Sequence, residues 1–273
     1  PVYFANTSEA SKWLKLGQVD FAEVFRGYGE ATIRVREAGC SAAEGFDKYA
    51  ITYERCWCLE KRKDQRDCAL LLVHILKPII IHCGTPCTKM CQLGSKELDA
   101  DTKAQIDFTI KIAKHQEALG YGASIENPKG SKLTSYPAFQ SVFGTFDKPD
   151  GNWAFYRSEG CQLGMKFPGM EDAGRPIQKA SFWVANFDLA SMELRCRHPS
   201  ALAPSTHEHH HARGTMTVAE GIKNVASFTG RYTPQQGTVY ARCCKAFIEQ
   251  VRDKGRTKKA VQTDTRRLVE ESD

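Results

Sequence analysis

The sequence contains no uninterrupted apolar run of roughly eighteen residues, the length that a membrane-spanning helix requires. Its longest apolar stretch runs from Ala69 to Ile81 and is broken by His74, Lys77 and Pro78. We therefore predict a chain without a membrane span. A basic segment followed by an apolar one, the pattern of a secretory leader, is also missing at the start. The first residue is proline rather than methionine, which is typical of a processed product or of a piece of a larger polypeptide or assembly.

A strong excess of one charge is lacking as well. The net charge of +6 over 273 residues is mildly basic, so a polyanionic partner such as nucleic acid is permitted but not required. Basic residues cluster between residues 251 and 273, where Arg252, Lys254, Arg256, Lys258 and Lys259 are followed by Arg266 and Arg267. This tail suits a solvated helix end, and a nucleic-acid tether is the alternative.

Cysteine is plentiful, but its number and context do not suit a disulfide scaffold. The chain has 11 cysteines, an odd number, and 273 residues, whereas disulfide-rich scaffolds are short. We predict thiols rather than disulfides and, with them, a reducing intracellular compartment.

Short apolar segments and helical patterns alternate along the first half of the chain. Strands are expected at residues 19–25, 40–46, 78–83 and 123–125. Helices are expected at residues 30–38, 49–59, 68–76 and 101–119. Because strands that alternate with helices form parallel sheets covered on both faces, the pattern predicts an α/β fold with a Rossmann-like, doubly wound sheet.

The second half of the chain has a weaker pattern. Strands are expected at residues 153–157 and 179–185, and a last helix at residues 234–252. We predict three regions: a Rossmann-like cofactor-binding core at residues 1–150, the remainder of the sheet with a small irregular substrate-side extension at residues 151–250, and a charged tail at residues 251–273.

A glycine-rich turn, FRGYG at residues 25–29, follows the first expected strand. Glycines let a backbone approach a ligand closely, and the N-terminus of the following helix favours polar or negative groups. The third glycine of a dinucleotide fingerprint is missing, so a structural tight turn is an equal alternative. Glu44 and Asp47 end the next strand, where nucleotide-binding folds place a carboxylate on ribose hydroxyls. Asp47 also suits the N-cap of a helix.

Two reactive side chains follow later strands. Cys87 lies in CGTPCT, directly after the buried strand, at the sheet edge where ligands bind in this fold class. A thiol there is a candidate nucleophile, and a small core residue is the alternative. Glu126 lies in IENP after the next strand, where it suits a general acid or a loop cap before Pro128.

Taken together, these segments resemble the cytosine-C5 methyltransferases. The stretch VFRGYGEATIRVREAGCSAAEGFDKYA is similar to the first two motifs of that family. CGTPCT resembles its Pro-Cys motif, and IENP resembles its Glu-Asn motif. The motifs stand in the family's order and cover about residues 19–130. The resemblance implies a class I methyltransferase type of fold, S-adenosylmethionine as cofactor and nucleic acid, DNA or RNA, as substrate.

The resemblance also implies roles for individual residues. It assigns cofactor contacts to Phe25, Gly27, Gly29 and to Glu44 or Asp47. It makes Cys87 the nucleophile and Glu126 the acid that holds the ring. It assigns substrate contacts to Pro86, Asn127 and Arg175. Basic residues near these motifs are candidate contacts to a nucleic-acid backbone, although each also suits a solvated surface: Lys129, Lys132, Arg157, Lys166 and Lys179.

The later half departs from that family. It has no clear Gln-x-Arg-x-Arg motif, and RPIQK at residues 175–179 is the nearest candidate. It also has no Gly-Asn-x-Val motif near the C-terminus and no room for a large target-recognition domain. It looks similar to divergent methyltransferase-like domains of retroelements and protist polyproteins. We predict an enzyme, a methyltransferase of the cytosine-C5 type. The alternatives are a binding or assembly subunit that has lost turnover, and an RNA-modifying methyltransferase or another nucleotide-binding Rossmann protein.

A group of cysteine and histidine residues raises a separate question. Cys196, His198, His207 and His209 have a spacing that suits a structural Zn²⁺ site, and a polar histidine-rich loop is the alternative. We predict no catalytic metal, because catalysis in the family that the chain resembles needs none.

Overall fold

The computed structural model describes residues 12–90, 97–166, 176–196, 209–212, 215–218, 221–225 and 229–270. Five strands form the main sheet: β1 (Phe21–Val24), β2 (Ile80–Cys83), β3 (Gly122–Pro128), β4 (Ala154–Glu159) and β6 (Ala180–Ala185). Two small sheets pair β5 (Ile177–Gln178) with β7 (His210–His211) and β8 (Thr215–Val218) with β9 (Gly221–Asn224). The longer helices are α2 (Glu30–Glu37), α3 (Arg62–Leu70), α4 (Ala100–Ala118), α5 (Pro137–Phe143) and α7 (Pro234–Glu270).

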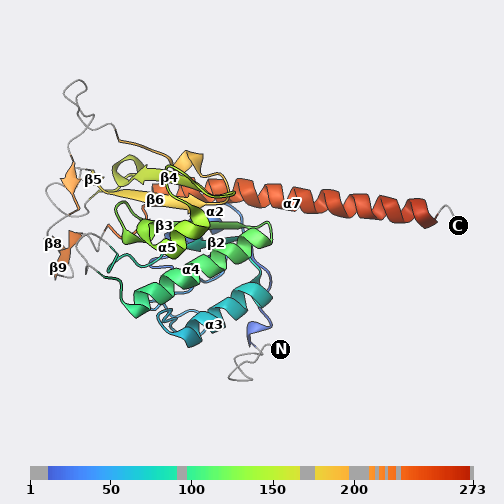
Figure 1. Ribbon diagram of the computed structural model, residues 1–273, viewed down its shortest axis with the longest axis horizontal. Helices are drawn as coiled ribbons and strands as arrows, with labels where there is room; N and C mark the ends of the chain where they lie inside the picture. The colour runs from blue at the N-terminus through green and yellow to red at the C-terminus, as the bar shows by residue number, and fades with distance from the viewer. Residues whose placement is uncertain are drawn as a thin grey trace.

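The main sheet has the order β1-β2-β3-β6-β4 (Figure 1). Strands β1, β2 and β3 are parallel, and β6 is inserted antiparallel between β3 and β4. Helices connect the parallel strands, because neighbouring parallel strands need a long crossover. This arrangement confirms the predicted α/β fold with a Rossmann-like, doubly wound sheet. Strands β4 and β6 come from the predicted second region and complete the sheet of the first.

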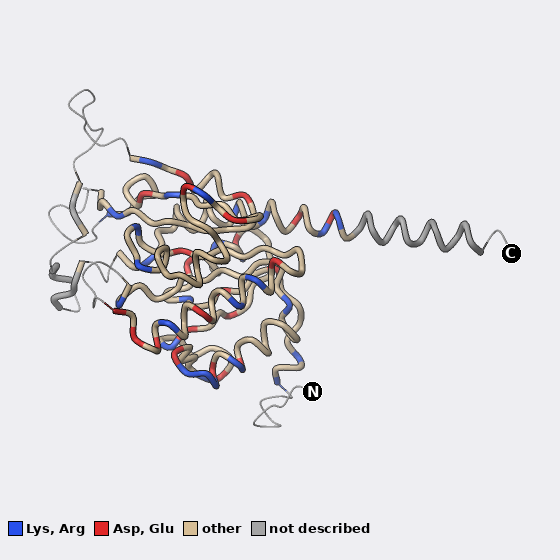
Figure 2. Tube along the Cα trace, in the orientation of Figure 1, with Lys and Arg blue, Asp and Glu red and all other residues tan. Residues whose placement is uncertain are grey.

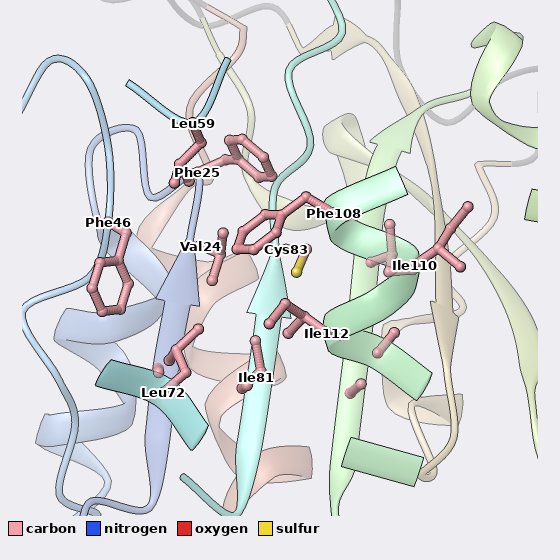
Figure 3. Close-up of a cluster of buried hydrophobic side chains, with 14 of the residues drawn as sticks. Val24, Phe25, Phe46, Leu59, Leu72, Ile81, Cys83, Phe108, Ile110 and Ile112 are labelled. Atoms are coloured by element: carbon pink, nitrogen blue, oxygen red, sulfur yellow. The ribbon is translucent and has the colours of Figure 1, made fainter. Parts of the chain in front are cut away.

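Two hydrophobic clusters cover the two faces of the sheet. Because side chains alternate along a strand, Phe21 and Ile80 face one cluster while their neighbours Ala22 and Ile81 face the other. The first cluster packs α4 and the segment around α3 against the sheet, as Figure 3 shows for Phe108 and other labelled side chains. The second packs α2 and α7 against the opposite face. Burial on both faces explains why β1 and β2 are nearly continuous apolar runs.

Charged residues do not separate by sign on the helices. Figure 2 shows Lys and Arg interspersed with Asp and Glu along α3, α4 and the beginning of α7. No helix in the described part of the chain is both long and apolar enough to cross a membrane. None of the ten cysteines in that part forms a disulfide.

Most predicted elements are present, with shifted ends. The segment predicted as a strand at residues 40–46 contributes only two isolated parallel bridges, from Ala42 and Phe46, at the outer edge of β1. The helix predicted at 68–76 instead begins at Arg62 and continues as a π-helix, Leu71–Leu76. The last helix continues beyond its predicted end at residue 252, to Glu270, and projects past the sheet in Figure 1.

The helix predicted at residues 49–59 is wrong. The segment forms turns with an isolated bridge between Thr52 and Arg55, and Tyr53 has a positive φ of 52°. Trp57 explains the difference: its ring is 1% exposed and packs on Phe46 with 5.0 Å between ring centroids. Its indole N–H donates to the carbonyl oxygen of Thr52 over 3.0 Å. Tertiary burial of this indole outweighs the local helical pattern.

Candidate functional site

A cavity of about 730 Å³ opens where the loops after β1, β2 and β3 meet. This is the edge at which doubly wound sheets bind ligands. Seven residues predicted for the site line the cavity: Phe25, Gly27, Gly29, Asp47, Pro86, Cys87 and Glu126. The segments predicted to carry the cofactor, the nucleophile and the acid therefore meet in one space, although about a hundred residues of sequence separate the first from the last.

The glycine turn is shaped around a side chain as well as around the cavity. Gly29 has a φ of 73°, and a Cβ added there would lie 2.2 Å from the Nε atom of Arg26. A Cβ added at Gly45 would lie 2.6 Å from the Cδ atom of the same side chain. The Arg26 side chain therefore lies against both glycines. It occupies the space that a side chain at position 29 or 45 would need. Its Nε atom is buried and has no hydrogen-bond partner among the described residues. Arg26 was not among the residues predicted for the site, although a charged residue inside a glycine turn is itself an indication of a binding role.

The two glycines of the turn should respond differently to alanine. Gly27 also has a positive φ, 55°, but an added Cβ meets nothing within 4 Å. Gly27→Ala should therefore cost about 1 kcal/mol of stability from backbone strain alone. Gly29→Ala should cost about 2–3 kcal/mol, because the methyl group must also displace Arg26. Urea unfolding of the two variants measures the difference, and equal costs would show that Arg26 does not occupy this space.

Asp47 connects the turn to the following loop. Its carboxylate accepts hydrogen bonds from the backbone N–H of Gly27 over 2.9 Å and of Tyr49 over 2.8 Å. It lines the cavity and at the same time holds the turn in position. Glu44, the other predicted carboxylate, does not line the cavity. Its side chain is 57% exposed and pairs with Arg36 on the surface.

Hydrogen bonds with residues of β1 and β3 hold the loop that carries Pro86 and Cys87 in place. The backbone N–H of Gly84 donates to the carbonyl oxygen of Val24 over 3.1 Å. Asn127 donates from its Nδ2 atom to the carbonyl oxygen of Thr85 over 2.6 Å. Asn127 is fully buried and does not line the cavity, so its contacts position the Cys87 loop instead of reaching into the site. Cys87 itself is half-buried at the cavity wall.

Glu126 lies at the end of a buried chain of polar groups. Tyr232 donates a hydrogen bond from its hydroxyl to Glu126 over 3.2 Å, and the Nε2 atom of His82 lies 2.8 Å from the same hydroxyl. The Nδ1 atom of His82 lies 2.9 Å from the hydroxyl of Ser124, which in turn lies 2.7 Å from that of Tyr240. The chain thus runs from α7 through β2 and β3 to the cavity.

The electrostatic environment of these hydrogen-bonded groups favours their neutral forms. Burial raises the pKa of Glu126, although Lys179 opposes the shift. Burial also lowers the pKa of His82 to about 3, so the imidazole is neutral near pH 7. With a neutral ring, one nitrogen of His82 donates and the other accepts, which allows every hydroxyl in the chain to donate toward Glu126.

Glu23 is a second buried carboxyl group in the cavity wall, and sequence analysis missed it. It is 2% exposed, and burial raises its pKa from 4.5 to about 7. Its carboxylate accepts hydrogen bonds from the backbone N–H of Thr32 over 3.1 Å and from the Thr32 hydroxyl over 2.6 Å. The available signal was a carboxylate inside the otherwise apolar strand FAEV.

A smaller cavity of about 510 Å³ adjoins the first and shares Pro128 and Lys179 with it. Lys129 and Arg157 also line this cavity. Three of the basic residues that the sequence suggested for a nucleic-acid backbone thus lie around one hollow. Arg157 is paired with the buried Glu159, which offsets part of this positive charge.

The remaining predicted residues lie elsewhere. Arg175, His198 and His207 are outside the described residues. Cys196 and His209 do not line either cavity but approach each other, with 3.3 Å between Sγ and Nε2.

Comparison with known proteins gives a weak structural similarity and no match to a family or a curated protein. No protein-family model matches the chain, and no curated protein matches it. The predicted similarity to domains of retroelements and protist polyproteins therefore stays a prediction. Among solved structures, the chain is similar to the crystal structure of the Dnmt2 methyltransferase of S. pombe, with 12% sequence identity and a TM-score of 0.39. The match covers 63% of this chain and 51% of that enzyme, so the chain spans about half of its length. A similarity at this level carries no argument on activity or substrate.

Proposed function

We propose that the chain is an S-adenosylmethionine-dependent methyltransferase that acts on the C5 position of cytosine in a nucleic acid. One observation carries this proposal: the glycine turn, the Cys87 thiol and the Glu126 carboxyl group line the same cavity at the carboxyl edge of the parallel strands. A nucleophile and a ring-binding acid are the two groups that this chemistry needs.

The cavity suits the proposed cofactor in size and composition. About 730 Å³ lies within the ordinary range for small-molecule sites. No acceptor for the buried Nε atom of Arg26 lies among the described residues, and the carboxylate of an amino-acid moiety would provide one. Phe25 offers aromatic surface for a purine, while Glu23 and Asp47 complement a positive charge and hydroxyl groups. When bound, S-adenosylmethionine supplies an electrophilic methyl group on a positively charged sulfur.

In the proposed mechanism, the Cys87 thiolate adds to C6 of cytosine, which makes C5 nucleophilic enough to accept the methyl group. Burial raises the pKa of Glu126, which favours a carboxyl group that shares a proton with N3 and so stabilises the charge that develops on the ring. Tyr232 holds the Glu126 carboxyl group in place. A base, for which a water molecule suffices, then takes the C5 proton; the C5–H electron pair forms the C5–C6 double bond, the C6–S bond breaks and the Cys87 thiolate leaves.

A nucleic-acid substrate fits the surroundings of the cavity. The Tyr28 side chain is 60% exposed at the cavity wall, and the guanidinium of Arg231 lies 3.5 Å from its ring centroid. Aromatic rings and arginine planes of this kind stack on unpaired bases. Lys129, Arg157 and Lys179 in the neighbouring cavity would contact phosphates, which makes binding dependent on salt. A cytosine in a duplex must leave the base stack to reach Cys87.

The test measures cofactor binding and methyl transfer separately. Calorimetry should show binding of S-adenosylmethionine, and the radiolabelled methyl group should appear in 5-methylcytosine after incubation with mixed DNA or RNA. Transfer to RNA alone would support the RNA-modifying alternative. Cofactor binding without transfer to either polymer would support the binding or assembly subunit. A chain that binds NAD and not S-adenosylmethionine would contradict the proposal.

A further inference from the structure

We propose that Cys161, Cys196 and His209 form a zinc site that stabilises the region beside the cavity. Cys161 lies in a short 3-10 helix, Gly160–Leu163, directly after β4. Cys196 and His209 lie in segments that are distant from it in sequence. The ligating atoms of all three residues nevertheless lie within 4.8 Å of one another. Spacing alone could not select Cys161, because it stands 35 residues before Cys196.

The geometry suits zinc. Zinc bonds of about 2.3 Å to sulfur and about 2.0–2.1 Å to nitrogen place neighbouring ligand atoms of a tetrahedron about 3.5–3.8 Å apart. The 3.3 Å between the Cys196 Sγ and His209 Nε2 atoms and the 4.8 Å limit for the whole group bracket these values. Two thiolates and an imidazole select zinc over magnesium or calcium, which prefer oxygen.

Cysteine binds zinc as the thiolate and not as the thiol. Zinc replaces the thiol protons when it binds, so its uptake should release protons and weaken as the pH falls.

Among the described residues, the apolar cluster in this part of the fold is small and contains Met165, Ile177 and Val225. A two-stranded sheet such as β5–β7 is marginally stable by itself. A metal bound to Cys161, Cys196 and His209 would connect three chain segments there, in the way that structural zinc supplements a thin core. Gly160, next to Cys161, lines the larger cavity, so the same link would hold one wall of the site.

The test is the metal content of the full chain and does not depend on methyl transfer. Protein expressed with zinc should contain about one zinc ion per chain by mass spectrometry of the metal. Cobalt substituted for zinc should give the absorption of tetrahedral thiolate coordination. Cys161→Ser and Cys196→Ser should each lose most of the metal, whereas Cys56→Ser, at an exposed thiol outside the group, should keep it. Because the cobalt spectrum is measured on the parent chain, the test does not rely on the variants folding.

Three results would overturn the proposal. In the first, the parent chain binds neither zinc nor cobalt. In the second, the double variant of Cys161 and Cys196 keeps the metal, which places it on other residues. In the third, peptide mapping finds a Cys161–Cys196 disulfide in place of a metal. Each of these can occur with cofactor binding and methyl transfer intact, so the zinc site and the proposed function can fail separately.

Discussion

Cys87→Ser should abolish methyl transfer and leave the binding of S-adenosylmethionine nearly unchanged. A serine hydroxyl is a far weaker nucleophile than a thiolate, and loss of a covalent nucleophile should reduce the rate at least about 10³-fold. Cys87 is half-buried in a loop whose position is set by Gly84 and Asn127, so the substitution should not disturb the fold. The measurement is the rate of radiolabel transfer, with calorimetry of the cofactor alongside it.

The control and a chemical trap sharpen this test. Cys56→Ser removes an exposed thiol that does not line the cavity and should keep the full rate. An oligonucleotide with 5-fluorocytosine offers no C5 proton to lose, so its adduct should persist on the peptide that contains Cys87. Transfer that continues at the parental rate in Cys87→Ser would refute the role of this thiol, whether or not the cofactor binds.

Glu23→Gln should stabilise the protein in alkaline solution. The folded state raises the pKa of Glu23 from its ordinary 4.5 to about 7, so its contribution to stability is fully present below about pH 4.5. That contribution is lost as the pH rises through 7, because the unfolded chain gives up the proton more readily than the buried carboxyl group does. The shift corresponds to about 3 kcal/mol. Glutamine resembles the protonated acid and keeps an oxygen for the two hydrogen bonds from Thr32.

Denaturant unfolding at about pH 4 and about pH 8 tests this prediction. The variant and the parent should be equally stable at the lower pH, and the variant should gain up to about 3 kcal/mol at the higher one. His82 acts in the opposite direction, since its lowered pKa costs stability as the pH falls below 6.5, but it does so in both proteins and cancels. Glu44→Gln, at the exposed pair with Arg36, is the control and should change stability by less than about 0.5 kcal/mol. A Glu23→Gln variant that gains nothing at the higher pH would contradict the prediction.

A gain in stability from removing a buried carboxylate would have a functional meaning. Proteins keep costly ionisable groups chiefly where they are used, and such groups collect at ligand sites. Glu23 lies in the wall of the same cavity as Cys87 and Glu126. The stability measurement would therefore point to the site without any assay of activity.

Sequence patterns predicted the strands of the sheet well where a segment is buried on both faces. They predicted poorly where the burial of one side chain determines the local backbone conformation. The apolar runs before Gly84 and around Ser124 became β2 and β3, because a parallel strand buried on both faces leaves a pattern that other structures rarely produce. The segment around Trp57 has a helical pattern, yet burial of one indole against Phe46 bends it into turns. Residue order along the chain carries no record of such a contact.

The sequence by itself determined the positions of most strands of the main sheet and of the helices beside them, together with the presence of a glycine turn, a thiol and an acid after successive strands. Those features are local, and the carboxyl ends of parallel strands always meet at one edge. Only the tertiary structure decided that Arg26 fills the space over two glycines, that Asn127 supports a loop from below, and that Cys161 meets Cys196 and His209. These contacts join residues whose separation in sequence has no period, so they exist only once the core has packed.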